Sequence, residues 1–212
     1  MTFRPRRSWL FLLLLGVLAP NCPALDAAAL RQQVLERQRQ TRSWSADFTQ
    51  TLVMPGMRQP VVSAGSAAYL APDLLRLDFR QPAGEFVLIV ADHLYLQKAG
   101  AAAEVKALTG DGGGRPFQAL LGFLRGQPAA DDGAFDAAVT SEGDDYWFTL
   151  TRSPEAAAPS PRLIRNRIAR TTLDIREIFV ELPNGGTLTY RFDRVTRNQP
   201  IAAERFRPPQ LR

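Results

Sequence analysis

The sequence predicts a mainly β (α+β) protein with one antiparallel sheet of about ten to eleven strands, curled into a barrel or half-barrel. Apolar and polar residues alternate in many short segments that follow one another closely, with turn residues between them. Only two segments have helical spacing, too few for the crossover helices of a parallel sheet. Many short antiparallel strands are typical of sheets that curl on themselves.

Residues 1–24 are predicted to be a signal peptide that is removed on export. Three arginines among the first seven residues precede an apolar run at residues 9–19, and proline and small residues follow it. This run is too short to span a bilayer, which takes about 20 residues. We expect cleavage after Ala24. The alternative, lipid attachment at Cys22, requires a small residue where Asn21 stands.

The remaining chain, residues 25–212, is predicted to be a single domain with little net charge. The whole chain has 26 basic and 21 acidic residues, and three of the bases lie in the signal peptide, so 23 bases face 21 acids. This balance gives no support to nucleic-acid binding. The only cysteine is also removed, so no disulfide is expected. We expect a soluble periplasmic monomer held together by its core.

Two helices are expected. Residues 25–43 place Leu30, Val34 and Leu35 on one face of an amphipathic helix. A shorter helix over residues 115–126 carries a wide apolar stripe. The segment between the strands and this second helix, residues 99–114, is rich in glycine and is predicted to be a surface loop.

Five strands are predicted before this loop and five after the second helix. Pro55-Gly56, Gly143-Asp144 and Asn184-Gly185 provide turns between them. The predicted strands are residues 44–54, 60–70, 73–81, 85–92, 94–99, 135–142, 145–153, 162–174, 176–182 and 187–195.

The strand between Pro72 and Pro82 has one apolar and one polar side. Its apolar side carries Leu75, Leu77 and Phe79, and the alternate positions are charged. From the residues alone, this apolar side faces either a filled core or a cavity for an apolar ligand. Residues 85–92 are apolar in both phases and predict a strand covered on both faces, with no indication of which phase points inward.

Few residues are available for catalysis or metal binding. After removal of residues 1–24 there is one histidine, His93, in a predicted turn, and no cysteine. The sequence has no nucleophile elbow and no cluster of metal ligands. We therefore expect neither an enzyme nor a cofactor.

Four segments, in order along nearly the whole mature chain, resemble the LolA family of periplasmic outer-membrane lipoprotein carriers. "SWSADFTQTL" is similar to the first strand of the family, and "GSAAYLAPDLLRLDFRQP" to its next strand pair. "TGDGGGRPFQALLGFL" resembles the loop and helix that form a lid in these proteins. "LDIREIFVELPNGGTLTYRFDRVTRNQPIAAERFRPP" resembles the closing hairpin and the C-terminal end.

The resemblance implies a half-closed β-barrel with a helical lid, and a carrier that takes acyl chains from an inner-membrane donor to an outer-membrane acceptor. The cargo would be an acylated lipoprotein or a lipid. Carried over to this sequence, the groove consists of Phe48, Leu75, Leu77, Phe79 and Tyr95, and the lid of Phe117, Leu120, Leu121 and Leu124. Leu77→Glu is expected to abolish cargo binding, and Arg76→Glu to be tolerated much better.

One position departs from the family. Where the best-known carriers have an arginine that holds the lid shut, immediately before the first proline of the strand pair, this sequence has Ala71. The latch is therefore missing or supplied from elsewhere. This departure favours a divergent carrier serving a dedicated envelope-lipid pathway, and a non-catalytic envelope sensor of the same fold is an alternative.

Overall fold

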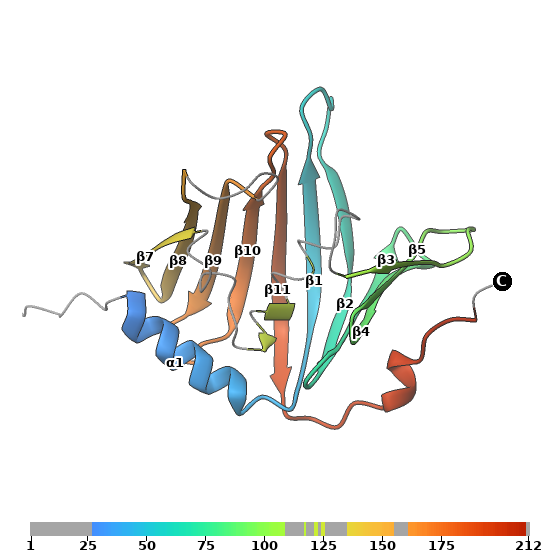
Figure 1. Ribbon diagram of the computed structural model, residues 1–212, viewed down its shortest axis with the longest axis horizontal. Coiled ribbons are helices and arrows are strands. Elements are labelled where there is room, and N and C mark those ends of the chain that lie inside the picture. Colours follow the sequence, from blue (N-terminus) through green and yellow to red (C-terminus); the bar gives the residue numbers. More distant parts are fainter. Residues whose placement is uncertain are drawn as a thin grey trace, which may run out of the picture.

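A single open antiparallel sheet dominates the computed structural model, which describes residues 27–108, 117, 121–122, 124–125, 135–154 and 161–210. In these residues eleven strands follow the order β6-β5-β4-β3-β2-β1-β11-β10-β9-β8-β7 (Figure 1). β6 and β7 are the two edges of this sheet and do not pair with each other in the described residues, so the barrel is not closed. The predicted mainly β, half-closed architecture is confirmed. Residues 1–24, the predicted signal peptide, lie outside the described residues.

Except for β6 and β7, consecutive strands pair with each other, and β1 pairs with β11 to join the two halves of the sheet. The strands are β1 (Ser43–Val53), β2 (Val61–Leu70), β3 (Leu74–Gln81), β4 (Glu85–Val90), β5 (His93–Gln97), β6 (Glu104–Ala107), β7 (Phe135–Glu142), β8 (Asp145–Arg152), β9 (Leu163–Ala169), β10 (Ile175–Glu181) and β11 (Thr187–Arg197).

All ten predicted strands are present, and one was missed. The segment at residues 99–114, predicted to be a loop, contains the edge strand β6, which pairs with β5. All four residues of β6 are exposed, so neither face of the strand has to be apolar and no alternation marks it. The predicted strand at residues 162–174 is also too long, because a turn follows β9.

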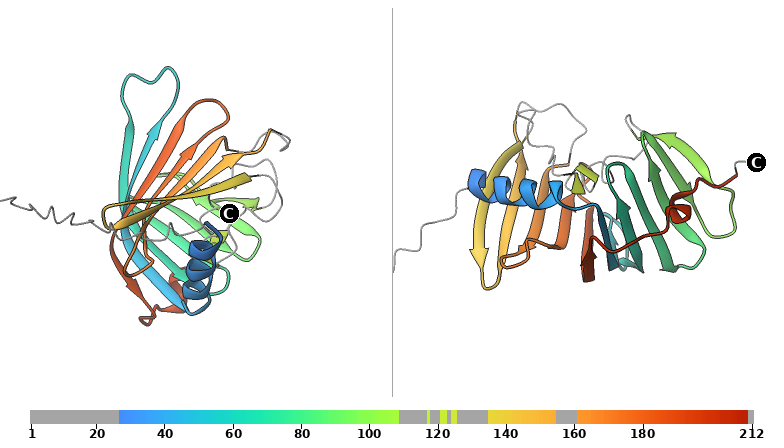
Figure 2. Two further views of the ribbon diagram at one scale, coloured as in Figure 1. Left: turned by 90° about the vertical axis from the view of Figure 1, so that its left-hand side faces the viewer. Right: turned by 90° about the horizontal axis from the view of Figure 1, so that it is seen from below.

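The helix α1 (Ala27–Arg39) lies on the concave side of the sheet, against its second half (Figure 2). Leu30 and Val34 are buried in the main apolar core, as predicted, while Leu35 is only partly buried. Gln38 instead continues the buried stripe. Arg197 of β11 donates from Nη1 to Thr41 Oγ1 at 2.7 Å, and this bond ties the end of the helix to the sheet.

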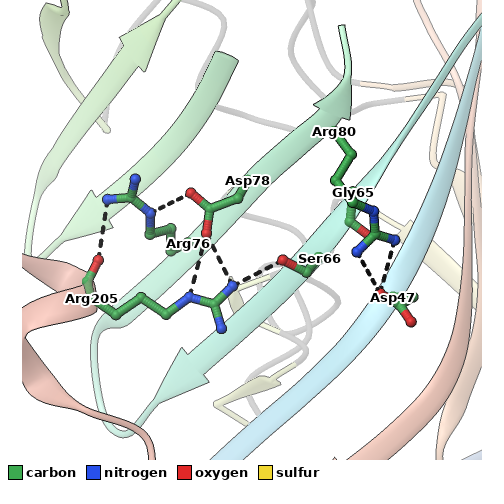
Figure 3. Close-up of polar contacts among 7 residues, drawn as sticks. All are labelled: Asp47, Gly65, Ser66, Arg76, Asp78, Arg80 and Arg205. Atoms are coloured by element: carbon green, nitrogen blue, oxygen red, sulfur yellow. Dashed lines mark hydrogen bonds and ion pairs between the residues drawn. The ribbon is translucent and has the colours of Figure 1, made fainter. Parts of the chain in front are cut away.

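The outer face of β2–β5 is covered by the C-terminal segment. The short 3-10 helix η2 (Ala203–Phe206) buries Phe206 against Ala68 and Leu88, which form a second, smaller apolar cluster. Arg205 of η2 donates from Nη2 to Asp78 Oδ2 and to Ser66 Oγ, both at 3.0 Å (Figure 3). The charged side of the strand between the two prolines is therefore a docking surface for the C-terminus.

This arrangement changes the expectation for Arg76. Its side chain is 20% exposed, its Nε donates to Asp78, and its Nη1 donates to the Arg205 carbonyl at 3.1 Å. The guanidinium also lies 4.5 Å from the centre of the Phe86 ring. In Arg76→Glu like charges would lie beside each other and the contact with η2 would be lost, so we expect a cost in stability; that it is tolerated much better than Leu77→Glu stays a prediction.

A second polar cluster links the outer faces of β1, β3 and β11. Both terminal nitrogens of Arg80 donate to Asp47 Oδ1 at 2.9 Å, and Arg194 donates to Asp47 Oδ2 (Figure 3 shows the Arg80 pair). Arg194 has a positive φ of 51°, at the register shift between β1 and β11. Hydrogen bonds from Arg80 and then Arg194 hold the pKa of Asp47 below its usual 3.8.

We predict that Asp47→Asn lowers the free energy of unfolding near neutral pH by about 1 kcal/mol, as for a partly exposed ion pair. Because the folded-state pKa is depressed, the carboxylate stabilises the fold above its unfolded pKa, and this contribution is lost as pH falls through the folded value. The difference between the two proteins should therefore be constant above about pH 5 and shrink below pH 4. Urea unfolding at several pH values measures it, and a pH-independent difference would contradict the assignment.

Candidate functional site

The concave face of β1–β5 brings together four of the five predicted groove residues. In the register of the sheet, Leu75 lies between Tyr69 and Ile89, and Leu77 lies between Ala67 and Val87. Leu75 and Leu77 are fully buried, Phe48 is 2% exposed, and Phe79 is partly buried at the margin of the same cluster. The alternation in the sequence therefore located one continuous apolar face.

Gly65 allows the Phe48 ring to lie across β2. Phe48 is opposite Gly65, and Gly65 is opposite Phe79, so the two aromatic rings meet over a residue without a side chain. Their centroids are 5.1 Å apart in an edge-to-face arrangement. A Cβ on Gly65 would lie 2.8 Å from the Phe48 ring and 2.1 Å from the Asp78 carbonyl oxygen. Glycine at this position thus shapes the apolar face.

Tyr95 does not belong to this face, and its assignment to the groove is wrong. It pairs with Leu88 and packs in the outer cluster with Phe206, because its position in β5 has the opposite phase from Leu94. Leu94, which is fully buried and pairs with Ile89, occupies the concave position instead. The phase of β4 that the sequence left open is likewise determined: Val87 and Ile89 face the concave side.

The apolar face continues into the second half of the sheet through a group of aromatic rings. Trp44 meets Phe192 edge-to-face at 5.3 Å, and Tyr190 stacks on Phe192 at 6.2 Å. Tyr190 also approaches Phe48 at 6.1 Å. Burial raises the pKa of Tyr190, so its hydroxyl stays protonated at physiological pH. These rings connect the predicted groove with the region covered by α1.

The predicted lid covers this face. Phe117, Leu121 and Leu124 lie in helical segments. Leu121 and Leu124 are each 1% exposed and belong to the same cluster as Leu75 and Leu77, while Phe117 packs at its margin. Leu120 lies outside the described residues. Leu121 and Leu124 are thus buried in one apolar cluster with Leu75 and Leu77 of the sheet.

An arginine of the lid segment fastens it to the β2–β3 turn. Arg125 donates from Nε to the Pro72 carbonyl oxygen at 3.1 Å, and its Nη2 lies 2.6 Å from Asp73 Oδ1. The Tyr69 hydroxyl donates to the same Pro72 oxygen at 3.2 Å, and burial raises the pKa of Tyr69. Ala71 itself contributes only backbone here, with its N–H donating to Arg42 O. The arginine that joins the two segments therefore lies on the lid segment and not at position 71 of the sheet.

Two clefts lie beside this apolar region. One, of about 310 Å³, runs between the end of α1, the β2–β3 turn and Arg125, and is lined by Gln38, Arg39, Thr41, Tyr69, Ala71, Pro72 and Asp73 as well. The other, of about 460 Å³, lies along β9–β11 and includes Arg167, Arg176, Arg191 and Arg194 with two aspartates. Carboxylates neutralise much of that charge, as in the Arg191–Glu177 pair at 3.0 Å. The first cleft is the margin at which the lid meets the sheet.

His, Cys, Asp and Glu side chains are the groups that could hold a metal ion. Among the described residues, no group of three or more of them has the arrangement of a metal site. His93 is exposed at the start of β5, with its ring 6.4 Å from Tyr95. In the described part of the chain, no helix is long and apolar enough to cross a membrane.

A curled open sheet whose apolar concave face is covered by helical segments is a LolA-like fold. The family model described as outer membrane lipoprotein carrier protein LolA matches residues 39–209, and the chain belongs to this family. Among curated proteins, none matches this sequence.

Solved structures share this fold at low sequence identity. A crystal structure of MucB is 14% identical with a TM-score of 0.53, covering 86% of this chain and 62% of MucB. An uncharacterised conserved protein from Thermus thermophilus is 11% identical with a TM-score of 0.52, covering 84% and 94% of the two chains. A LolA superfamily protein from Nitrosomonas europaea is 9% identical with a TM-score of 0.44, covering 87% and 99%. At these identities the similarity concerns the fold alone.

Sequence reasoning missed three residues of this site. Arg125 follows Leu121 by four positions, so on a helix it shares a side with the buried leucine, and this spacing was a usable signal. Tyr69 precedes the turn at Pro72 and ends the alternation of β2 on the concave side. Leu94 was hidden because residues 94–96 are all apolar or aromatic, and such a run does not reveal its phase.

We predict that Arg125→Gln loosens the lid. The lost contacts join groups that are 30% and 41% exposed, so their removal should cost about 1 kcal/mol and raise local opening about fivefold. Hydrogen exchange of the amides at residues 121–125, followed by mass spectrometry, measures this. Arg39→Gln is the control, because Arg39 lines the same cleft with a side chain 70% exposed. Equal exchange in the two variants would argue against the latch.

Proposed function

We propose that this protein is a periplasmic carrier that shields the acyl chains of a lipoprotein or lipid between the inner and the outer membrane. The observation that carries the proposal is a continuous apolar face on β1–β5, covered by lid side chains that are held at their margin by Arg125. Membership in the outer membrane lipoprotein carrier family supports it. An inner-membrane donor and an outer-membrane acceptor would be its partners.

The free energy of binding an acyl chain can exceed the free energy that holds the lid closed, so cargo can displace the lid. Burying Leu121 or Leu124 stabilises the closed lid by about 2 kcal/mol each, and the latch adds about 1 kcal/mol. An acyl chain gains about 0.8 kcal/mol per CH₂ on leaving water, or about 12 kcal/mol for a long saturated chain. One acyl chain therefore outweighs the lid contacts that it displaces, and the returning lid lowers the cost of release.

The latch favours a divergent member of the family. With Ala71 in the turn, the lid is held through a backbone carbonyl and Asp73, so the cation moves with the lid rather than staying on the sheet. We infer that the cargo is a lipid or lipoprotein of a dedicated envelope pathway. The protein would act without catalysis.

Tryptophan fluorescence tests the carrier function directly. The processed chain has two tryptophans: Trp44 is 1% exposed on the concave face, and Trp147 lies on the outer face beside Arg165. A fatty acid with a doxyl group should quench Trp147→Phe, in which Trp44 remains, and should leave Trp44→Phe largely unquenched. Lipid extracted from detergent-free protein, identified by mass spectrometry, names the cargo.

Absence of quenching in Trp147→Phe, together with absence of copurified acyl species, would rule out the carrier. Capture of a protein in place of lipid would favour the envelope-sensor alternative. The two readouts are independent, because one measures a probe added to the protein and the other measures what the protein has retained.

We predict that Leu77→Glu lowers acyl-chain affinity at least tenfold, because an unpaired carboxylate on an apolar face is costly to bury. Thr49→Glu is the matched control: Thr49 lies on the outer face of β1, opposite Arg191, where a carboxylate meets a cation. Circular dichroism confirms that each variant is folded. If both variants lose affinity equally, Leu77 does not face the cargo.

A further inference from the structure

The end of the β1–β2 hairpin exposes apolar side chains. Among the described residues, five large hydrophobic side chains are classed as exposed, and four of them lie here: Val53 at 40%, Met57 at 44%, Val61 at 45% and Val62 at 61%. The hairpin extends beyond the neighbouring strands (Figure 1). We call residues 53–62 the hairpin tip. Grouped exposure of this kind marks a contact surface more often than scattered apolar residues do.

The apolar character of the tip extends over both faces of the hairpin. Val62 pairs with Thr51 and Val61 pairs with Leu52, so adjacent valines point to opposite sides. Lower on the same ribbon, the outer face is polar, with Asp47 opposite Ser66. Between Ser66 and the tip, the outer face thus changes from polar to apolar. The core does not require this change, because the side chains at the tip are not covered by it.

The charge of the tip is limited to one cation. Residues 48–72 contain no aspartate or glutamate, and Arg58 is their only base. Arg58 is exposed, and the ion pairs of the described residues do not include it. An apolar end with one unpaired cation is complementary to a phospholipid surface, where apolar side chains enter the headgroup boundary and a guanidinium binds phosphate.

The tip is supported by its neighbour. A Cβ on Gly186 would lie 2.6 Å from Met54 Sδ, and one on Gly185 would lie 3.8 Å from Pro55 Cγ, so the β10–β11 turn packs closely against the base of the tip. The Met57 N–H also donates to Met54 O at 3.1 Å. The β10–β11 turn and the Met57–Met54 hydrogen bond hold the hairpin tip in place. Binding through the exposed valines and Met57 therefore costs little further chain entropy.

We propose that the hairpin tip docks this protein on phospholipid bilayers, with Val53, Met57, Val61 and Val62 in the headgroup region and Arg58 on the phosphates. The inference extends the proposed carrier function and rests on it for its purpose, since acyl cargo is loaded and released at membranes. Vesicle binding, however, is measured without cargo. The tip and the lid latch lie at opposite ends of β2, about 30 Å apart along the strand.

Flotation with vesicles tests the docking site. The processed protein is mixed either with vesicles of phosphatidylethanolamine and phosphatidylglycerol or with vesicles of phosphatidylcholine alone. Val62→Glu should reduce the floated fraction on anionic vesicles about tenfold, because a carboxylate replaces a side chain that enters the interface. Val105→Glu is the matched control, since Val105 is 40% exposed on the edge strand β6. It should float like the unaltered protein.

Arg58→Gln separates the ionic contribution from the apolar one. It should weaken binding to anionic vesicles about fivefold and reduce the dependence of binding on salt. Binding to phosphatidylcholine should change much less. Equal floated fractions for Val62→Glu and Val105→Glu, or no flotation of the unaltered protein, would overturn the proposal. Self-association that Val62→Glu abolishes would also overturn it and assign the tip to a second copy of the chain.

The acyl-chain assays keep this proposal separate from the carrier function. If the protein floats through its tip but no doxyl fatty acid quenches Trp44, the docking site stands and the carrier function fails. If acyl chains bind but the unaltered protein does not float, the carrier function stands and the docking site fails. Val62→Glu should retain acyl binding, because Val62 lies outside the covered apolar cluster.

Discussion

Burial of the concave face is the constraint on which the rest of this structure depends. An open sheet has to shield its inner apolar side with separate segments, because its edge strands β6 and β7 do not pair to close it. Leu30 and Val34 of α1 cover part of that face, and Leu121 and Leu124 of the lid segment cover another part. A cover made of short pieces is separable from the sheet, and a filled closed barrel would not offer this property. The same constraint that stabilises the fold therefore provides the apolar surface on which the proposed carrier function rests.

The outer face is organised by different forces. There, arginine–carboxylate contacts join strands that are distant in sequence, as Asp47 does for β3 and β11, and the C-terminal helix η2 is held by Arg205. Such polar links are directional, so they fix how the strands and the C-terminus sit without requiring a second large apolar core. The outer polar links therefore do not depend on what covers the concave side.

Much of the fold was readable from the sequence, because alternation in β1–β3 is strong and turns such as Asn184-Gly185 are distinctive. The concave positions of Leu75 and Leu77 followed from that alternation. Prediction failed where the sequence does not show which side chains of a strand point inward. Tyr95 lies in an apolar run, and it faces the outer side of the sheet, where it packs in the cluster of Phe206, more than a hundred residues away. The four residues of strand β6 are all exposed, so no alternation of apolar and polar residues marks this strand in the sequence. The role of Arg125 depends on a tertiary contact with Pro72, which no local pattern contains.

The Pro72 carbonyl oxygen, described above as the acceptor for both Arg125 and Tyr69, has one further consequence. Tyr69 is part of the floor beneath the cover, whereas Arg125 belongs to the cover itself. Both compete for, or share, the lone pairs of a single atom. One carbonyl oxygen thus joins the concave face of the sheet to the segment that carries Arg125, so the positions of the phenol and the guanidinium are geometrically linked.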